Sequence, residues 1–463
     1  MIISSLAPEA RHAAARRAGL LPFAFGARFF VALLLGLLWT IPAWWQPRFI
    51  AIMFLWDAVV LAAWLSDLLR LPSPAQLTAR RSWQEPLIRA RTAAVTLEIT
   101  NAGAAAVYLS AVDELTPALS GYPPSFEFGI PARLSATRGY TVLPVTRGDV
   151  AIGDLFLRYR SALGLAERWA RVPLSQTVRV FPDLVQARQD ALYLIRSRQV
   201  EMEKRRRRQR GQGRDFETLR EYRHGDEMRD ICWTATARRN QLTTRVYQVE
   251  RSQTVWIVLD AGRLLRAEVR DSDRPPASKL DYAVDAALSL AQVASQSGDR
   301  VALLAYGRGI QHLIGGGRGP LHLRAILDAL SLVRAEASEA SHARAAQALL
   351  RRQSRRSLIV WLTDFAETVT TPEVVEYALH LTARHLVVFA AIAQPDLADL
   401  AAAVPQNVED MFRTAAALEV VERRNRLLCA LRDRGVLVAD VAAAGLTGAV
   451  LNRYLEVKDR NLL

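Results

Sequence analysis

The segment TVWIVLD, residues 254–260, decides the fold predicted for the C-terminal half of this chain. It is an apolar run of strand length, and similar runs alternate with amphipathic helical patterns to the end of the sequence. Strands that alternate with helices in this way are typical of a parallel sheet covered on both faces. The pattern predicts a Rossmann-like α/β domain over residues 254–463. Its expected strands are 255–259, 301–306, 358–362, 386–392 and 436–441, and its expected helices include 280–294, 322–333 and 408–432.

A densely charged segment precedes this domain. Between residues 215 and 251, seven basic and seven acidic side chains balance one another, which favours pairing among themselves over a charged ligand. The glycine motifs 211–213 and 315–317 lack the preceding strand, third glycine or Gly-Lys-Ser/Thr of a phosphate loop. We therefore expect no nucleotide site, and we expect 315–317 to be a turn before a helix that begins near Pro320.

Ten positions of the charged segment carry a family signature. Their spacing resembles that of the bacterial domain of unknown function fifty-eight family, and the run NRYLEVK at 452–458 resembles the family's ending. The resemblance implies a von Willebrand factor A-like (vWA) domain after the signature and a MoxR-type AAA+ ATPase as partner. The signature itself is expected to be a structural clamp or a docking surface. Its residues are Leu219, Arg220, Tyr222, Gly225, Asp226, Arg229, Ile231, Trp233, Ala237 and Arg238.

The resemblance to vWA domains also implies a divalent cation at the carboxyl ends of the strands. In that family an Asp-x-Ser-x-Ser loop, a threonine and a later aspartate hold a magnesium-type ion. Asp260 and Asp364 match the two aspartates, but Gly262 and Leu264 replace the serines, and the loop 315–320 has no threonine. Because Mg²⁺ needs oxygen ligands in near-octahedral geometry, we expect no cofactor. Mg²⁺ held by the two aspartates, with Thr363 as a substitute ligand, is the alternative.

Length and composition set the outer limits. The chain has 463 residues, of which 51% are hydrophobic and 23% charged, so it is long enough for more than one folded domain. Cys232 and Cys429 are its only cysteines and lie far apart. This usage excludes a disulfide scaffold and a zinc site, and it fits a reducing compartment.

Two apolar stretches predict a membrane anchor over residues 1–72. Residues 29–45 carry no charge and residues 49–65 carry only Asp57, and each approaches the roughly 20 residues that span a bilayer. The three-residue link between them predicts a transmembrane helical hairpin. A cleaved signal peptide is the alternative, although the sequence lacks a small-x-small cleavage site. We expect Asp57 to be neutral or paired with a polar group of a partner helix rather than to serve transport.

The arginines predict how the hairpin is oriented. Positive residues collect on the cytoplasmic side of membrane proteins, and here they flank both spans, whereas the turn holds Arg48 alone. We therefore expect a bacterial inner (cytoplasmic) membrane protein with its bulk in the cytoplasm. The flanking residues are Arg11, Arg16, Arg17 and Arg28 before the first span, and Arg70, Arg80 and Arg81 after the second.

Residues 75–185 predict a small β-sandwich-like domain. In VTLEIT, residues 95–100, apolar and polar side chains alternate as in a half-buried strand. The region has almost no histidine, cysteine or clustered carboxylate, so we expect it to be a spacer or a binding domain. Further strands are expected at 107–111, 140–145, 150–159 and 176–181.

A basic linker and the signature occupy residues 186–253. Anionic lipid headgroups attract each Lys or Arg near the membrane by about 1 kcal/mol, and a solvated linker is an equal alternative. Nucleic acid is not the expected partner because no aromatic residues interleave with the charges. The basic residues are Lys204, Arg205, Arg206, Arg207, Arg208 and Arg210.

No catalytic constellation stands out. His224 has no marked nucleophile near it, and Cys232 lacks an evident activating base and is expected to be a small buried residue. We therefore expect no enzyme but a membrane-anchored scaffold or adaptor. Its vWA-like domain would bind proteins and work with a MoxR-type AAA+ ATPase in assembly or maturation of another complex. A metal-dependent hydrolase and a nucleic-acid-binding membrane protein are the alternatives.

Overall fold

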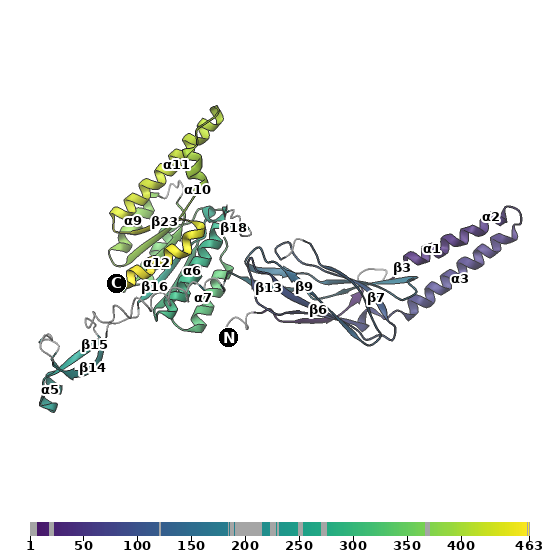
Figure 1. Cartoon of the computed structure of the whole chain (residues 1–463), viewed down its shortest axis with the longest axis horizontal. Helices are drawn as coiled ribbons and strands as arrows, with labels where there is room; N and C mark the ends of the chain where they lie inside the picture. The colour runs from purple at the N-terminus through teal and green to yellow at the C-terminus, as the bar shows by residue number, and fades with distance from the viewer. Residues whose placement is uncertain are drawn as a thin grey trace. The chain divides into compact units, whose positions relative to one another are not determined.

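The computed structural model describes residues 7–17, 23–119, 122–183, 185, 189, 215–222, 228, 231–248, 253–269, 276–365, 371–460 and 462. The chain divides into two compact units, Met1–Phe181 and Pro182–Leu463 (Figure 1). The predicted basic run, His224 and the signature residues Gly225, Asp226 and Arg229 lie outside the described residues.

Three β-sheets build most of the first unit. Their strand orders are β1-β4-β6-β9, β10-β13-β5 and β2-β12-β11-β7-β8, with β3 also paired to β12. In β6, AAVTLEITN, every second side chain is buried, as expected for a strand with one face on a core. The strands are β1 Arg11–Ala14, β2 Arg16–Arg17, β3 Phe23–Phe25, β4 Leu77–Trp83, β5 Leu87–Ile88, β6 Ala93–Asn101, β7 Val107–Asp113, β8 Ser125–Ile130, β9 Ser135–Val142, β10 Gly148–Ile152, β11 Leu155–Arg160, β12 Ala166–Val172 and β13 Gln176–Phe181.

Apolar side chains of two of these sheets share one core. Leu97 and Ile99 of β6 belong to the same buried cluster as Leu109 of β7 and Leu157 of β11. The sheets therefore pack face to face, which is the arrangement of a β-sandwich. We call this part of the first unit the β domain, and it corresponds to the all-β region predicted from the sequence.

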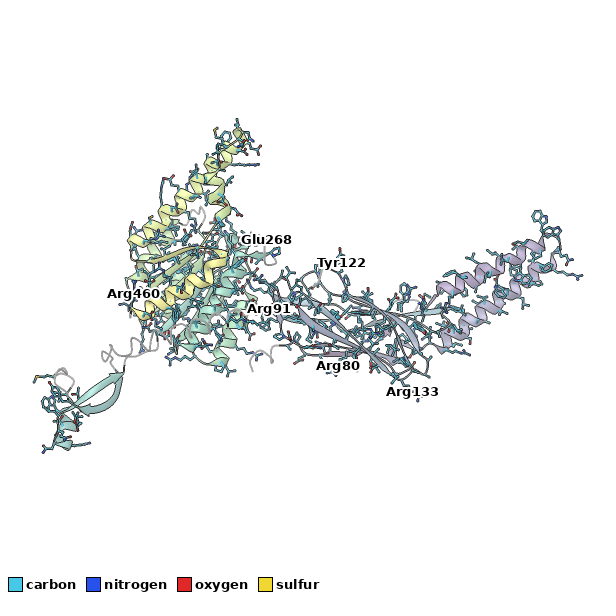
Figure 2. All side chains as sticks on the ribbon, viewed as in Figure 1. Arg80, Arg91, Tyr122, Arg133, Glu268 and Arg460 are labelled. Atoms are coloured by element: carbon cyan, nitrogen blue, oxygen red, sulfur yellow. The ribbon has the colours of Figure 1, made fainter. Side chains whose placement is uncertain are left out.

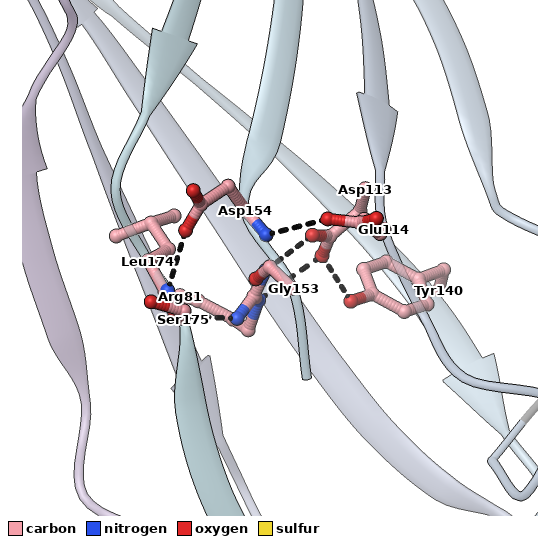
Figure 3. A network of polar contacts seen from close by, with 8 residues as sticks. All are labelled: Arg81, Asp113, Glu114, Tyr140, Gly153, Asp154, Leu174 and Ser175. Carbon is pink, nitrogen blue, oxygen red and sulfur yellow. Dashed lines mark hydrogen bonds and ion pairs between the residues drawn. The ribbon is translucent and has the colours of Figure 1, made fainter. Parts of the chain in front are cut away.

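A buried ion pair connects strands of the two facing sheets. Arg81 of β4 pairs with Asp113 of β7, and neither side chain is exposed. Arg81 also donates hydrogen bonds to the carbonyl oxygens of Leu174, at 2.9 Å, and Gly153, at 3.1 Å. The Tyr140 hydroxyl donates to Asp113 at 2.5 Å (Figure 3). Both charges are therefore fully hydrogen-bonded, which is the condition for burying charge without a large penalty.

Helices leave the β domain between β3 and β4. They are α1 Ala27–Gly36, the 3₁₀ turn η2 Leu37–Trp39, α2 Thr40–Ala43 and α3 Arg48–Arg70. Of the described helices, α3 is long and apolar enough to cross a membrane, since 23 residues span about 35 Å. Pro42 lacks an N–H and crowds the carbonyl of Leu38, which accounts for the break between α1 and α2. The Trp56 indole N–H donates to the carbonyl oxygen of Ala32 at 2.8 Å and joins α3 to α1.

The helices are an insertion in the β domain. Strands β1, β2 and β3 precede α1 and pair with β4 and β12, whereas the sequence prediction placed all of residues 1–72 in the anchor. Each of these strands has two to four residues. Such short strands are too brief for the alternation that reveals longer ones.

Asp67 near the end of α3 fixes the helix to the β domain. Its buried carboxylate accepts hydrogen bonds from the Ser161 hydroxyl at 2.5 Å and from the backbone N–H groups of Leu165, at 3.1 Å, and Ala166, at 3.0 Å. Arg168 donates to the carbonyl oxygen of Leu68 at 3.0 Å. The helix and the sheets are therefore held together by specific polar contacts as well as by apolar packing.

A six-stranded sheet forms the centre of the second unit. Its order is β20-β19-β16-β21-β22-β23, and each neighbouring pair is parallel except β19 and β20. All five predicted strands are present. The strands are β16 Thr254–Asp260, β19 Arg300–Tyr306, β20 Ile310–Gly317, β21 Leu358–Thr363, β22 Leu386–Ala393 and β23 Leu437–Ala442.

Helices cover both faces of this sheet (Figure 1). On one face α6 packs against α7 and α12. On the other, α8, α9 and α11 contribute Ala345, Val374 and Leu428 to a core with Trp256 and Trp361. We call the sheet and its helices the α/β domain. The helices are α6 Lys279–Gln296, α7 Pro320–Leu332, α8 His342–Arg352, α9 Thr371–Thr382, α10 Pro395–Ala402, α11 Val408–Asp433 and α12 Leu446–Asp459.

The glycine triplet 315–317 is part of strand β20, so the predicted turn at this place is wrong. Glycines carry no side chain, and the alternation that marks a strand is hidden here. At Gly317 the backbone passes close to His322, where an added Cβ would lie 2.5 Å from the ring nitrogen Nδ1. The other ring nitrogen of His322 lies 2.7 Å from the carbonyl oxygen of Val301, and this contact joins α7 to β19.

Candidate functional site

The strand order reverses beside β16, with β19 on one side and β21 on the other. In sheets of this kind, ligands bind at the carboxyl ends of the strands at such a reversal. Asp260 is the last residue of β16, and Asp364 follows Thr363, the last residue of β21. The Thr363 hydroxyl donates to Asp260 Oδ2 at 2.6 Å. The structure therefore brings both predicted aspartates and Thr363 to this one edge.

Asp260 is buried and engaged by neighbouring donors at both oxygens. The backbone N–H of Gly262 donates to its Oδ1 at 2.7 Å. Burial raises the pKa of Asp260, while His342 and the hydrogen bonds from Thr363 and Gly262 oppose that rise. The site therefore disfavours the charged form of Asp260, and the neighbouring donors offset only part of that cost.

Asp364 is the partner of a buried lysine. Lys279, the first residue of α6, places Nζ 2.6 Å from Asp364 Oδ2, and the side chains are 8% and 0% exposed. Gln394 Nε2 donates to the same oxygen at 2.9 Å. Oδ1 of Asp364 is buried without a hydrogen-bond partner among the described residues.

A chain of polar aromatic contacts lies behind the two aspartates. The Trp361 indole N–H donates to the Tyr306 hydroxyl at 2.6 Å, and that hydroxyl lies 2.7 Å from His342 Nδ1. Burial, followed by the charge of Asp260, raises the pKa of Tyr306 well above its ordinary value. These contacts fix the imidazole of His342 next to the carboxylates.

The cavity at this edge is small. It measures about 20 Å³ and is lined by Asp260, Gly262, Arg263, Leu264, Glu339, Ala340, His342 and Asp364. One water molecule needs at least about 10 to 15 Å³, whereas ligand pockets measure roughly 300 to 1,000 Å³. The cavity has room for a water molecule or a single ion and not for an organic substrate.

The oxygens at this edge fit Mg²⁺ poorly. Both oxygens of Asp260 and Oδ2 of Asp364 already accept hydrogen bonds from protein donors, and only Asp364 Oδ1 is left. Mg²⁺ requires about six oxygens in octahedral geometry. Within the described part of the chain, no group of three His, Cys, Asp or Glu side chains could hold a metal ion.

The sequence prediction missed Lys279, His342 and Gln394. Lys279 carries a usable signal, because a positive charge at the first position of a helix faces the positive end of the helix dipole. A buried positive charge at that position calls for a carboxylate close to it. The identity of that carboxylate is invisible in sequence, since Asp364 lies 85 positions away.

The described part of the signature is a β-hairpin with one short helix. Strands β14 (Asp215–Glu221) and β15 (Thr243–Gln248) pair antiparallel, and α5 (Trp233–Arg239) lies between them in sequence. Ile231 and Cys232 are buried, as predicted for Cys232, whereas Trp233 is 67% exposed. The signature residues Ala237 and Arg238 are also exposed, Tyr222 is partly buried, and Leu219 and Arg220 lie in β14.

A helical arm extends from the α/β domain. It consists of α10 and the first half of α11; Figure 1 shows these helices extending beyond the sheet, and Figure 2 shows their side chains. Leu427, Leu428 and Leu431 at the far end of α11 join the core, but α10 buries no residue and the first half of α11 buries only Thr414 and Ala417. The large apolar residues of the arm are exposed; they are Leu400, Val404, Val408, Met411, Phe412 and Leu418.

A wider groove of about 420 Å³ runs along the edge strand β23. Asn452, Arg453 and Glu456 of α12 line it together with Arg432 of α11 and Asp440 of β23. Val438, Ala439, Val441 and Ala449 complete the lining, which is therefore mixed polar and apolar. Three of these residues belong to the C-terminal run that resembles the family's ending.

Residues 218–430 match the model of the family described as Protein of unknown function DUF58. The match confirms the resemblance predicted from the signature. It begins in β14 and ends within α11, so it includes the hairpin, both aspartates and the arm. No curated protein matches the chain.

Proposed function

We propose, from the premise that residues 218–430 are a DUF58 region, that this chain is a membrane-anchored, non-catalytic scaffold that binds another protein. The single observation that carries the proposal is the row of exposed apolar side chains on the arm. Large exposed apolar patches are typical of interaction sites. The small cavity at Asp260 and Asp364 supports the non-catalytic part, because it has no room for a substrate.

The α/β domain is in this proposal a vWA-like domain. The strand order, taken in chain order, is 3-2-1-4-5-6, with the third strand antiparallel to the second. This order supports a doubly wound, Rossmann-like arrangement. Asp260 and Asp364 then correspond to the first and the last aspartate of the vWA metal-binding pattern, in which Gly262 and Leu264 replace the two serines.

The anchor in this proposal is a hairpin of two membrane spans, α1–α2 and α3, in the bacterial inner membrane. Strands of the β domain precede and follow the hairpin, so both of its ends lie on one side of the membrane. The arginines on both flanks favour the cytoplasmic side. Trp44 and Trp45 at the turn are 89% and 76% exposed, which suits indoles at the opposite interface.

The arm has the geometry of a docking helix. Val408, Met411 and Phe412 are spaced i, i+3 and i+4, so they lie on one face of α11. They are 67%, 52% and 67% exposed. An apolar stripe of this spacing is the kind that inserts into a groove of a partner protein.

The charge of the arm indicates the kind of groove that its partner would have. Although the chain carries a net charge of +14, residues 395–413 hold Asp396, Asp399, Glu409 and Asp410 against Arg413 alone. An acidic apolar surface is repelled by anionic lipid and attracted by a basic rim. The proposed partner is therefore a protein with an apolar groove edged by Lys and Arg. The family resemblance proposes a MoxR-type AAA+ ATPase for this role, with ATP hydrolysis supplied by that partner during assembly or maturation of another complex.

The test is a binding titration between the full-length protein in detergent and the purified MoxR-type ATPase of the same organism. The double substitution Val408→Ser and Phe412→Ser should weaken binding by about tenfold or more, since buried apolar anchors at an interface each contribute about 1 to 2 kcal/mol or more. Leu321→Ser is the matched control, because Leu321 is 83% exposed on α7, outside the arm. Equal binding by all three proteins would exclude the arm as the docking surface.

A further inference from the structure

Lys279 is a buried cation that contacts one of the two aspartates for which the vWA resemblance implies a metal ion. Its ammonium group contacts Asp364 at 2.6 Å, and Asp260 lines the same edge of the sheet. Lysine is among the residues least often buried, and it is found inside proteins when it is paired. Both members of this pair are shielded from solvent, so the ion pair belongs to the interior of the folded domain.

The position of Lys279 in its helix makes the pairing specific. Ser278 caps α6 and accepts a hydrogen bond from the N–H of Asp281, so Lys279 occupies the first helical turn. The helix dipole opposes a positive charge there, and burial opposes it further. Only a close carboxylate offsets both costs, and Asp364 is that carboxylate.

We propose that the ammonium group of Lys279 replaces the divalent cation at this edge of the sheet. It neutralises Asp364 and leaves no position at which a second cation is stable. Gly262 and Leu264 stand at the two positions where the vWA loop carries serines. In this proposal the site has lost both the serine hydroxyl ligands and the metal ion, and the ammonium group of Lys279 supplies the positive charge instead.

A lysine in place of a metal ion changes how the site is regulated. A bound metal ion responds to chelators and to the free metal concentration, whereas a lysine is present in every copy of the chain. The charge that faces Asp364 therefore does not depend on the concentration of divalent ions. Partner binding through the α/β domain is then independent of divalent ions, whichever surface the partner uses.

The test compares the full-length protein with Lys279→Ala, using Mn²⁺ and Mg²⁺ alone as probes. In the unsubstituted protein, neither ion nor EDTA should shift the melting temperature, and Mn²⁺ titrated with detection by electron paramagnetic resonance should show no stoichiometric site. Lys279→Ala strands the Asp364 carboxylate, which should lower the melting temperature by about 6 °C or more. Millimolar Mn²⁺ or Mg²⁺ should restore part of that loss, because the substitution frees Asp364 Oδ2 from Lys279, and Asp260 and Asp364 line the same cavity.

Lys458→Ala is the matched control. Lys458 Nζ contacts the buried Asp299 at 2.8 Å, but this pair has one carboxylate and the Tyr454 hydroxyl beside it. Divalent ions should not restore the stability of that variant. Stoichiometric Mn²⁺ binding by the unsubstituted protein that Asp364→Asn abolishes would overturn the proposal. The proposal would also be wrong if Lys279→Ala had the melting temperature of the unsubstituted protein. The same holds if Mn²⁺ restored the stability of Lys279→Ala no more than that of Lys458→Ala. The Mn²⁺ titration of the unsubstituted protein decides the matter even if Lys279→Ala does not fold.

Discussion

The two domains each bury an ion pair, and the pairs differ in how completely their charges are satisfied. In the β domain, Arg81 and Asp113 use all their polar atoms, and the loop carbonyls of Leu174 and Gly153 and the Tyr140 hydroxyl supply the remaining partners. In the α/β domain, Asp364 keeps one buried oxygen without a partner in the described structure. A fully satisfied pair is what a structural clamp requires, whereas an unmatched buried acceptor is typical of a site shaped for something other than stability.

The two pairs also differ in their position in the sheets. Arg81 and Asp113 lie in strands whose neighbours alternate regularly between core and surface. Asp260 and Asp364 lie where two parallel strands end and the strand order reverses. The same residue type therefore acts as a clamp within a sheet and as a site component at the carboxyl edge of one.

The largest effect is expected from Asp113→Asn. The substitution leaves the Arg81 guanidinium buried without its counter-charge, which costs about 3 to 5 kcal/mol. Denaturant unfolding of the full-length protein in detergent measures this loss as an earlier transition of the first unit. Asp149→Asn is the control, because Asp149 pairs with Arg179 where both side chains are 35% exposed, and an exposed pair contributes about 1 kcal/mol or less. Equal losses in the two variants would mean that the buried pair is no clamp.

Asp260→Asn is expected to have a smaller effect than Asp113→Asn. Burial raises the pKa of Asp260, so the folded protein already disfavours its charge, and a neutral amide of the same shape removes that penalty. Asparagine still accepts from the Gly262 N–H, and its amide can donate to the Thr363 hydroxyl. The net change in the free energy of unfolding should be within about 1 kcal/mol. A loss as large as that of Asp113→Asn would place Asp260 among the structural clamps and would contradict the distinction between the two pairs.

The sequence predicted the parts of the molecule that depend on local pattern. The five parallel strands of the α/β domain are continuous apolar runs, and all were found at their predicted places. Strand β20 was missed because its glycines hide the alternation, and β1 to β3 were missed because they are too short to show one. The helical hairpin was predicted, but its insertion between strands depends on long-range pairing that no local window contains.

The same limit applies to the site. Asp260 and Asp364 were identified because they match the two aspartates of the vWA pattern that the resemblance implies. Lys279 was not found, because its role depends on a contact with a carboxylate 85 residues away. The balanced charges of the signature remain a prediction where Asp226 and Arg229 are concerned, since both lie outside the described residues.

The smallest effect expected is a difference in acid sensitivity between the domains. Burial, and then the charge of Arg384, lowers the pKa of His385 in the α/β domain. The unfolded chain therefore binds this proton more readily than the folded one, and stability is lost as the pH falls from about 6.5 through the folded pKa. In the β domain, burial favours the protonated form of Asp154, but hydrogen bonds from Arg171 and Ser175 outweigh it and lower the pKa. That contribution is present above about pH 3.8 and is lost only below it.

At about pH 5, therefore, the His385 contribution should be weakened while that of Asp154 is intact. The measurement is the difference in melting temperature of the second unit between pH 7.5 and about pH 5, compared in the unsubstituted protein and in His385→Asn. Asparagine keeps a polar group near Ser357, whose hydroxyl lies 3.1 Å from His385 Nδ1, and it does not titrate. Because the raised pKa of Asp260 acts in the opposite direction as the pH falls, only the difference between the two proteins isolates the histidine. That difference should be about 1 kcal/mol or less at the melting temperature. An identical pH response in both proteins would show that the acid sensitivity of the α/β domain comes from groups other than His385.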